Sequence, residues 1–178
     1  PNGDWKQASL QLYADGVGTV PVSSKFSFDD GLEGWSTSGS VTSTQVDLAT
    51  QEQIINLEAS SVLSNMDLEL ATLAAPAVVD NYYLHVLFRS AASLDQIQVQ
   101  IKGIDAGLPF SVSAIPTSDF KEAVIDISDI YKESVMGSGE ANDIKVQFKS
   151  SAGFSSGDEV EVDYIEINDN SSLGNLSP

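Results

Sequence analysis

The sequence contains no cysteine, so it forms neither a disulfide nor a thiolate metal site. It has one histidine, so a histidine-based catalytic triad would have to use His85. Lys and Arg number 8 against 26 Asp and Glu, and the formal net charge is −18. This balance disfavours nucleic acids and anionic membranes, which bind basic clusters. No apolar run approaches the roughly 18 to 20 residues that span a membrane.

Catalytic signatures are also missing from the sequence. There is no HExxH metal motif, no phosphate-binding loop and no dinucleotide-binding fingerprint. The acidic residues lie mostly singly in turns and at strand ends, which does not favour a glycosidase pair of carboxylates. We therefore expect a non-catalytic protein. The chain starts at Pro1 without a signal-peptide pattern, so we expect a mature fragment or an excised piece of a longer chain.

Alternation of apolar and polar residues dominates what is present. The 178 residues, 42% of them hydrophobic, suffice for one domain with a core. About ten short segments alternate with period two, and many are separated by glycine-containing turns. Only residues 127–135 favour a helical turn, with Ser128 or Asp129 as its cap. This pattern predicts an all-β protein, either an antiparallel β-sandwich or a barrel.

The sequence divides into three parts. Residues 25–168 hold the alternating segments and form the predicted module. Residues 1–24 contain one strand-like run and read as a linker or an extra edge strand, and residues 169–178 read as a polar linker tail. We expect a monomeric module within a multidomain chain.

The stretch FSFDDGLEGW, residues 26–35, combines a strand pattern with paired acids, two glycines and a tryptophan. Phe26 and Phe28 alternate as strand residues, and Asp29 and Asp30 follow directly. The last alternating segment, EVEVDYIEI, carries Asp163 within an otherwise apolar strand. The first and last strands of a sandwich often pair, which would bring these carboxylates together. A calcium ion, which takes oxygen ligands, would relieve their repulsion.

These segments resemble the ends of jelly-roll, galactose-binding-like carbohydrate-binding modules, of which families four, nine, sixteen and twenty-two are nearest in style. FSFDDGLEGWSTSG opens the pattern and VDYIEI closes it, with YYLHVLFRSAA, FKEAVIDISDI and DIKVQFKSSAG between them. The resemblance covers about residues 25–168. It implies a two-sheet antiparallel jelly roll.

The resemblance also implies functional residues. In such modules a structural calcium joins the first strand to the last, which carries over to Asp29 or Asp30, to Glu52 in the loop at residues 50–53, and to Asp163. The Gly-Trp tryptophan is usually a core residue there, so we expect Trp35 to be buried.

Outward positions of three strands carry a local excess of basic and amide side chains. Segments 82–89, 96–102 and 143–149 place four of the eight Lys and Arg residues and the histidine on the face opposite their apolar residues. If the strands share a sheet, they form a shelf suited to sugar hydroxyls or carboxylates; an ordinary solvent face has the same composition. The candidate ligand-binding residues are Tyr83, His85, Arg89, Gln98, Gln100, Lys102, Lys145, Gln147 and Lys149.

We therefore expect a secreted polysaccharide-binding module of a polysaccharide-degrading enzyme from a marine bacterium. The alternatives are a structural or adhesive spacer of a surface protein, at the cell surface, and a small glycan-cleaving enzyme. The expected ligand is a polysaccharide, with a slight preference for a neutral or weakly charged chain over an anionic one that carries uronate or sulfate. The aromatic residues Tyr131 and Phe154 are the next candidates if the shelf does not bind.

Overall fold

The computed structural model describes residues 23–48, 53–74, 81–106, 109–112, 119–138, 140–169 and 171. Within them strands predominate, as the period-two pattern predicts. The elements are β1 (Ser23–Phe26), β2 (Trp35–Thr37), β3 (Val41–Asp47), β4 (Gln53–Ala59), β5 (Leu63–Ala74), β6 (Tyr83–Ser90), β7 (Gln96–Ile101), β8 (Ile104–Asp105), β9 (Phe110–Ser111), β10 (Lys121–Asp126), α2 (Ser128–Ser138), β11 (Glu140–Phe154) and β12 (Glu159–Asn168). None of the described helices is long and apolar enough to span a membrane.

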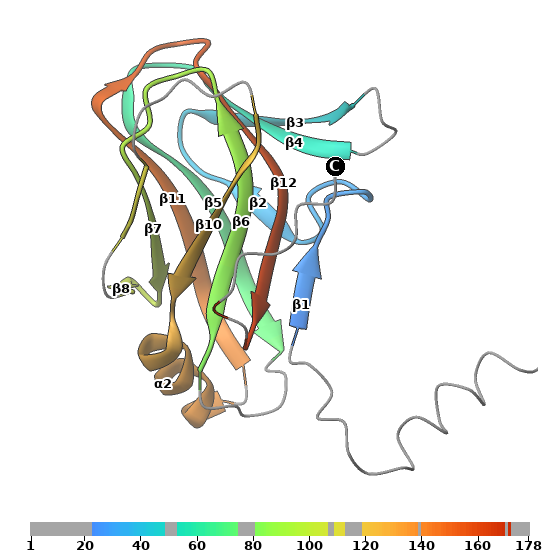
Figure 1. Ribbon diagram of the computed structural model, residues 1–178, viewed down its shortest axis with the longest axis vertical. Helices are drawn as coiled ribbons and strands as arrows, with labels where there is room; N and C mark the ends of the chain where they lie inside the picture. The colour runs from blue at the N-terminus through green and yellow to red at the C-terminus, as the bar shows by residue number, and fades with distance from the viewer. Residues whose placement is uncertain are drawn as a thin grey trace, which may run out of the picture.

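Two antiparallel sheets, each of six strands within the described residues, pack face to face as a jelly-roll sandwich (Figure 1). Sheet A has the strand order β10-β6-β12-β4-β3, and β1 also pairs with β12. Sheet B has the order β2-β5-β11-β7-β8, and β9 also pairs with β7. The predicted fold class is therefore confirmed, and the first and last strands pair as expected. β1 begins at Ser23, two residues before the predicted boundary of the module, while residues 1–22 lie outside the described residues.

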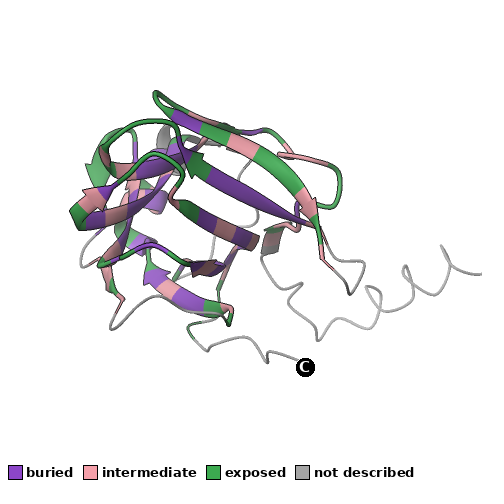
Figure 2. Ribbon diagram, turned by 90° about the horizontal axis from the view of Figure 1, so that it is seen from above, coloured by how far each residue is buried: buried purple, intermediate pink, exposed green. Residues whose placement is uncertain are grey.

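The core lies between the sheets, because each strand directs alternate side chains inward. Buried residues alternate with more exposed ones along several strands in Figure 2. Trp35 is buried, as predicted. The buried core also includes Phe28, Leu84, Val86, Phe88, Val99, Ile101, Val146, Phe148, Val162 and Ile165. Phe26 is only half-buried and packs edge-on against Trp35, with ring centroids 5.5 Å apart and an interplanar angle of 89°.

The stretch between β1 and β2 explains the unusual sequence FSFDDGLEGW. β1 ends at Phe26, so Phe28 does not continue the strand as its alternation predicts; its φ is 60° while its side chain is fully buried. Gly34 has a φ of 92°, a value that favours glycine because it has no Cβ. This turn delivers Trp35 to the core, where it pairs with Leu70.

Helix α2 extends three residues beyond the predicted helical turn and lies at one end of the sandwich (Figure 1). Its first amide is capped by the carboxylate of Asp126, which accepts the N–H of Ser128 at 2.9 Å. The predicted caps, Ser128 and Asp129, do not fill this role, because Asp126 reaches forward from the end of β10 and the Ser128 hydroxyl donates to Asp126 and to the carbonyl of Tyr82. Tyr131 in the helix and Phe154 in β11 are both fully buried, so neither is a surface platform for a ligand.

Candidate functional site

The shelf predicted from three strands is divided between the two sheets. β6, which carries Tyr83, His85 and Arg89, belongs to sheet A, whereas β7 and β11 belong to sheet B. The prediction that these strands form one surface is therefore wrong. Alternation fixes which face of a strand a side chain occupies, but strand pairing decides which sheet that face belongs to.

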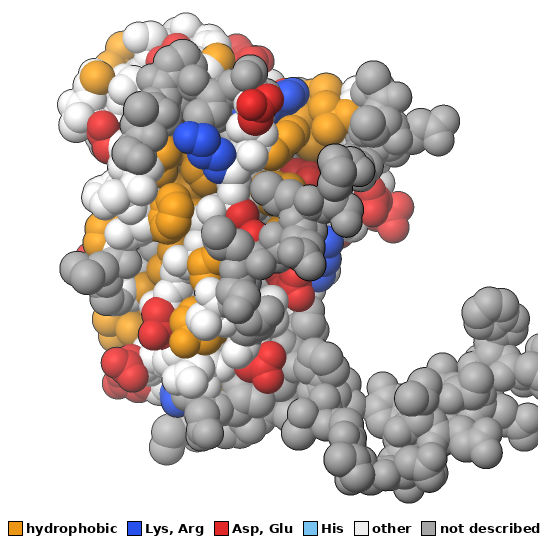
Figure 3. All heavy atoms as spheres, viewed as in Figure 1, with side chains coloured by type: hydrophobic (Ala, Val, Ile, Leu, Met, Phe, Trp, Pro, Cys, Tyr) orange, Lys and Arg blue, Asp and Glu red, His pale blue; other side chains and the backbone are white. Residues whose placement is uncertain are grey.

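His85 faces outward from sheet A, but it is only 2% exposed. Its Nδ1 lies 2.8 Å from Oε1 of Glu122 on β10, and Tyr164 of β12 donates its hydroxyl to the same oxygen at 2.9 Å. Burial is the main cause that raises the pKa of Tyr164, and the bond to Glu122 adds to it. The cluster joins β10, β6 and β12, so the position of His85 favours a structural role. No histidine is visible on the face shown in Figure 3, where acidic side chains outnumber basic ones.

Arg89, at the other end of β6, is engaged by its neighbours. Its guanidinium pairs with the carboxylate of Glu161 on β12 through Nε and through Nη2, the latter at 3.0 Å. The guanidinium carbon also lies 4.7 Å from the ring centroid of Phe120. The bond to Glu161 is the main cause that raises the pKa of Arg89. Tyr83, half-buried on the same strand, pairs in register with Asp126 and Asn168.

β5, β11 and β7 lie side by side in sheet B, and their outward side chains form a continuous polar surface. We call this surface the polar face. Its three central rows across β5, β11 and β7 are Asn65–Lys149–Gln96, Asp67–Gln147–Gln98 and Glu69–Lys145–Gln100. Ser36 of β2, Asp105 of β8 and Ser111 of β9 extend the rows at either side. No aromatic side chain stands at these described positions.

Lys145 neutralises the acidic side of the polar face. Its Nζ lies 2.8 Å from Oε1 of Glu69 and 3.6 Å from Oδ2 of Asp67. The hydrogen bond to Lys145 is the main cause that lowers the pKa of Glu69, and the same bond raises the pKa of Lys145. Asp67 also accepts an N–H from Asn65 at 2.6 Å. The ionised form of Glu69 is therefore stabilised, and both carboxylates on β5 are held in place by their polar neighbours.

Two glutamines occupy the centre of the polar face. Gln147 is 9% exposed and donates weakly from Nε2 to both carboxylate oxygens of Asp67, at 3.3 and 3.4 Å. Its Oε1 is buried without a hydrogen-bond partner in the described structure. Gln98, 5% exposed, donates to the carbonyl of Ala106 at 2.9 Å. A buried amide oxygen without a partner is uncommon in proteins and is satisfied when a ligand or water supplies a donor.

The remaining predicted residues of this sheet lie in different settings. Gln100 donates to Asp105 at 2.7 Å within the β7–β8 hairpin. Lys102 lies beyond the end of β7, in the exposed turn, with a φ of 52°, and is not part of the polar face. Lys149 lies on β11 and has no ion-pair partner within the described residues.

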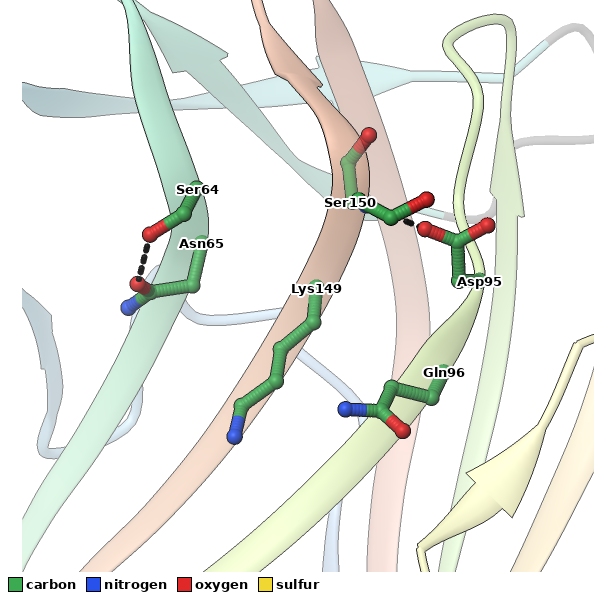
Figure 4. A pocket seen from close by; sticks show the side chains of 7 residues that line it. Ser64, Asn65, Asp95, Gln96, Lys149 and Ser150 are labelled. Carbon is green, nitrogen blue, oxygen red and sulfur yellow. Dashed lines mark hydrogen bonds between the residues drawn. The ribbon is translucent and has the colours of Figure 1, made fainter.

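A hollow of about 590 Å³ opens at one end of the polar face. Figure 4 shows side chains from three strand regions around it, with Lys149 extending between Asn65 and Gln96. The residues lining it are Ser64, Asn65, Asp95, Gln96, Lys149, Ser150 and Ser151. Asp95 accepts the backbone N–H of Ser151, and this bond is the main cause that lowers the pKa of Asp95.

Asn65, Asp67 and Glu69 are functional candidates that sequence reasoning missed. The segment MDLELATL is recognisable as a strand, and its alternation places Asp67 and Glu69 on the outward side. Alternation predicts the face on which a side chain lies, but it does not predict which strand pairs with this one. Only the pairing of β5 with β11 brings these acids beside Lys145 and Gln147.

The predicted calcium ligands lie at one end of the β1–β12 ribbon. Phe26 pairs with Ile165, and the strands are antiparallel, so the chain after Phe26 runs toward the residues before Ile165. Asp29 and Asp163 therefore belong to the same end of this ribbon. Asp163 lies where the register of β12 against β6 shifts, between Val162 and Tyr164.

The surroundings of the acids are mostly polar. Asp29 and Asp30 are exposed, and Asp29 accepts the hydroxyl of Ser27 at 2.8 Å. The carbonyls of Phe28 and Asp29 accept Nε2 of Gln45 at 2.7 and 3.1 Å. Glu52 lies outside the described residues. Within the described part of the chain, no group of three or more His, Cys, Asp or Glu is placed to hold a metal ion.

No family model matches the sequence, and no curated protein does. Among solved structures, the CBM22-1 xylan-binding domain of Xyn10C from Paenibacillus barcinonensis is 12% identical, with 84% of this chain and 95% of that chain covered and a TM-score of 0.53. The CBM22-1 and GH10 modules of Xyn10B from Clostridium thermocellum, complexed with xylohexaose, are 12% identical, with 89% and 29% covered and a TM-score of 0.51.

The glycoside hydrolase domain of Endo-D from Streptococcus pneumoniae R6 is 13% identical, with 78% of this chain and 22% of that chain covered and a TM-score of 0.50. At these identities the similarity establishes the fold. The resemblance seen in the sequence is thereby confirmed at the level of architecture, because two antiparallel sheets pack in the same arrangement. The chain has the jelly-roll fold of carbohydrate-binding modules.

Proposed function

We propose that the protein is a non-catalytic polysaccharide-binding module, and that it binds its ligand on the polar face of sheet B. The observation that carries the proposal is the centre of that face, where Asp67, Gln147 and Gln98 stand in one row and the buried amide oxygen of Gln147 has no hydrogen-bond partner in the described structure. A sugar hydroxyl supplies the missing donor when the Gln147 side chain turns outward to meet the ligand. The same hydroxyl can also accept a hydrogen bond from an amide N–H, so a sugar hydroxyl and a glutamine amide can form two hydrogen bonds with each other.

The arrangement of rows suits an extended glycan. Neighbouring strands are about 4.8 Å apart, and outward residues on one strand repeat about every 6.8 Å. A chain lying across β5, β11 and β7 therefore meets a polar side chain on each strand. Hydrogen bonds rather than aromatic stacking would hold it, since no aromatic residue stands at the described positions of the face.

The solved structures of similar fold support this reading. One is a xylan-binding domain, and another was complexed with xylohexaose. We propose by analogy that this chain is part of a larger secreted bacterial enzyme that degrades polysaccharide, and that the module brings that enzyme to its substrate. Xylan is the first polymer to test.

The carboxylates of the polar face favour binding over catalysis. A glycosidase needs one carboxyl group that stays protonated to act as general acid, and this requires a raised pKa. The pKa of Glu69 is instead lowered by Lys145, and Lys145 also lies 3.6 Å from Asp67. We expect no release of reducing ends from any polysaccharide that the protein binds.

Affinity electrophoresis in gels that contain xylan, β-glucan, galactan or glucuronoxylan tests the proposal. Gln147→Ala should lose most of its retention, whereas Arg89→Ala, on the opposite sheet, should migrate as the parent does. Melting temperatures of both variants control for unfolding. Retention that Arg89→Ala abolishes and Gln147→Ala preserves would place the site on sheet A. The absence of retention in every gel would leave the spacer function as the better reading.

We also propose the structural calcium ion that the sequence predicts, held by Asp29 or Asp30, Glu52 and Asp163. The chemistry of the described groups fits a hard cation, because they supply carboxylate and carbonyl oxygens at one end of the β1–β12 ribbon. The amide of Gln45 now donates to the carbonyls of Phe28 and Asp29, and it is the group that a cation would compete with.

Calcium would act on stability, since a ligand that binds only the folded state shifts the unfolding equilibrium. Excess chelator should lower the melting temperature, and added calcium should restore it. Asp163→Asn should remove this response, whereas Asp126→Asn, a carboxylate of sheet A away from the ribbon end, should keep it. An unchanged melting temperature under chelation would refute the site.

A further inference from the structure

The charges of the polar face are distributed unevenly between its two ends. At one end Lys145 is paired with Glu69 and Asp67, and Gln100 is paired with Asp105. At the other end Lys149 is half-buried in the hollow and has no ion-pair partner within the described residues. Lys149 is thus a positive charge between two strands, on a chain with a net charge of −18, that no carboxylate of the described residues neutralises.

The neighbours of Lys149 are polar groups that bind sugars and carboxylates. Asn65 and Gln96 flank it in register on either side, and no hydrogen bond engages the Gln96 amide in the described structure. The side chain of Lys149 extends away from Asp95, which stands on the other side of the hollow (Figure 4). Asp95 accepts a hydrogen bond from the backbone N–H of Ser151, and this bond partly offsets the negative charge of its carboxylate.

We propose that this hollow is the subsite for a uronic acid residue, so that the polysaccharide bound by the polar face is an acidic one. The proposal rests on the proposed function of that face. The uronate carboxylate accepts from the ammonium of Lys149 and from the amide of Gln96, and the ring hydroxyls bond to Asn65 and to the serines of the rim. A charged hydrogen bond of this kind is roughly twice as strong as a neutral one.

The size and position of the hollow support a single sugar residue rather than a longer segment. A volume of about 590 Å³ on an open surface takes one substituted pyranose with its waters, and the row of Gln147 and Gln98 begins next to it. A neutral sugar would fill the same space but would leave the Lys149 ammonium with water alone. The sequence slightly favoured a neutral or weakly charged ligand, because the modules that it resembles mostly bind neutral chains. The absence of an ion-pair partner for Lys149 was not visible in it.

The test compares three uronate-bearing polymers, glucuronoxylan, polygalacturonate and alginate, each with its carboxyl-reduced form, in which every uronate has become a neutral sugar. Affinity electrophoresis gives the dissociation constants. We expect at least one native polymer to bind tenfold or more tightly than its reduced form. Lys149→Gln should lower affinity for the native polymer to that for the reduced one. Lys121→Gln, which removes a positive charge from the edge strand of the other sheet, should not.

The outcomes separate this inference from the proposed function. Equal binding of the native and reduced polymers, or unchanged binding by Lys149→Gln, overturns the uronate subsite and leaves the polysaccharide-binding function standing. If the protein binds only neutral polymers, or only a sulfated galactan, the uronate subsite is likewise overturned and the polysaccharide-binding function stands. If neither the native nor the neutral polymers are retained, both proposals fail. Melting temperatures of the two lysine variants should equal that of the parent, since neither lysine forms an ion pair within the described residues.

Discussion

Replacing Tyr131 by Phe should stabilise the protein, and should do so more strongly at alkaline pH. Tyr131 is fully buried in helix α2, with its ring centroid 4.5 Å from that of Tyr82. Its hydroxyl is buried and has no hydrogen-bond partner in the described structure. A hydroxyl buried in this way costs about 1–3 kcal/mol, so its removal should raise the free energy of unfolding by about 1 kcal/mol at pH 7.

Ionisation adds a second contribution above pH 10. Burial, with a smaller effect of Tyr82, raises the pKa of Tyr131 to about 12, whereas a tyrosine in the unfolded chain titrates near 10. The unfolded state therefore loses its proton first, and the stability due to this group is present below pH 10 and lost as the pH rises toward 12. At pH 11 the loss amounts to about 1.4 kcal/mol, and the Phe variant is free of it.

Urea unfolding at pH 7 and pH 11, followed by far-ultraviolet circular dichroism, measures both contributions. The advantage of Tyr131→Phe should grow from about 1 to about 2.4 kcal/mol between these values. Tyr83→Phe, a half-buried position on sheet A, is the matched control and should change stability by no more than about 0.5 kcal/mol. A variant that is less stable than the parent at pH 7, or a difference that does not widen at pH 11, would refute the assignment of an unpaired buried hydroxyl.

Three further predictions concern the sandwich itself. Glu122→Ala should lower the free energy of unfolding by about 1–3 kcal/mol, because it removes the acceptor of His85 and Tyr164, and polysaccharide retention of the folded variant should be unchanged. Gly34→Ala should cost about 1–3 kcal/mol in urea unfolding, because the residue has a φ of 92°; a cost below 0.5 kcal/mol would contradict the strain. Phe148→Ala, in the centre of the core, should lower stability by about 3–5 kcal/mol, and a smaller loss would mean that the core closes around the cavity.

The fold class and most of the core follow from local sequence patterns. Period-two alternation needs no knowledge of neighbours, because each strand turns its side chains alternately to two faces whatever it pairs with. In segment 82–89 alternation places Leu84, Val86 and Phe88 on the apolar face, and all three are fully buried. The pairing of the first and last strands was predicted because these strands often pair in β-sandwiches, and β1 and β12 do pair.

Which outward-facing side chains lie together on one surface depends on strand pairing, which local sequence does not specify. Tyr83, His85 and Arg89 look equivalent to Gln98 and Lys145 in the sequence, but β6 pairs with β10 and β12 while β7 pairs with β11. Strand pairing is non-local: which strands pair depends on how the two sheets close over a shared core, and that depends on every strand at once.

For the same reason, the ion-pair partners of the lysines on the polar face could not be predicted from the sequence. Lys145 and Lys149 both point outward from the same face of β11, yet Glu69 on β5 forms an ion pair with Lys145 only. That difference arises from one register between strands some seventy-six residues apart in the chain. Burial of His85 on an outward face likewise required Glu122 and Tyr164 to arrive from two other strands. Local sequence sets the face of each residue, and the pairing of distant strands sets its partners.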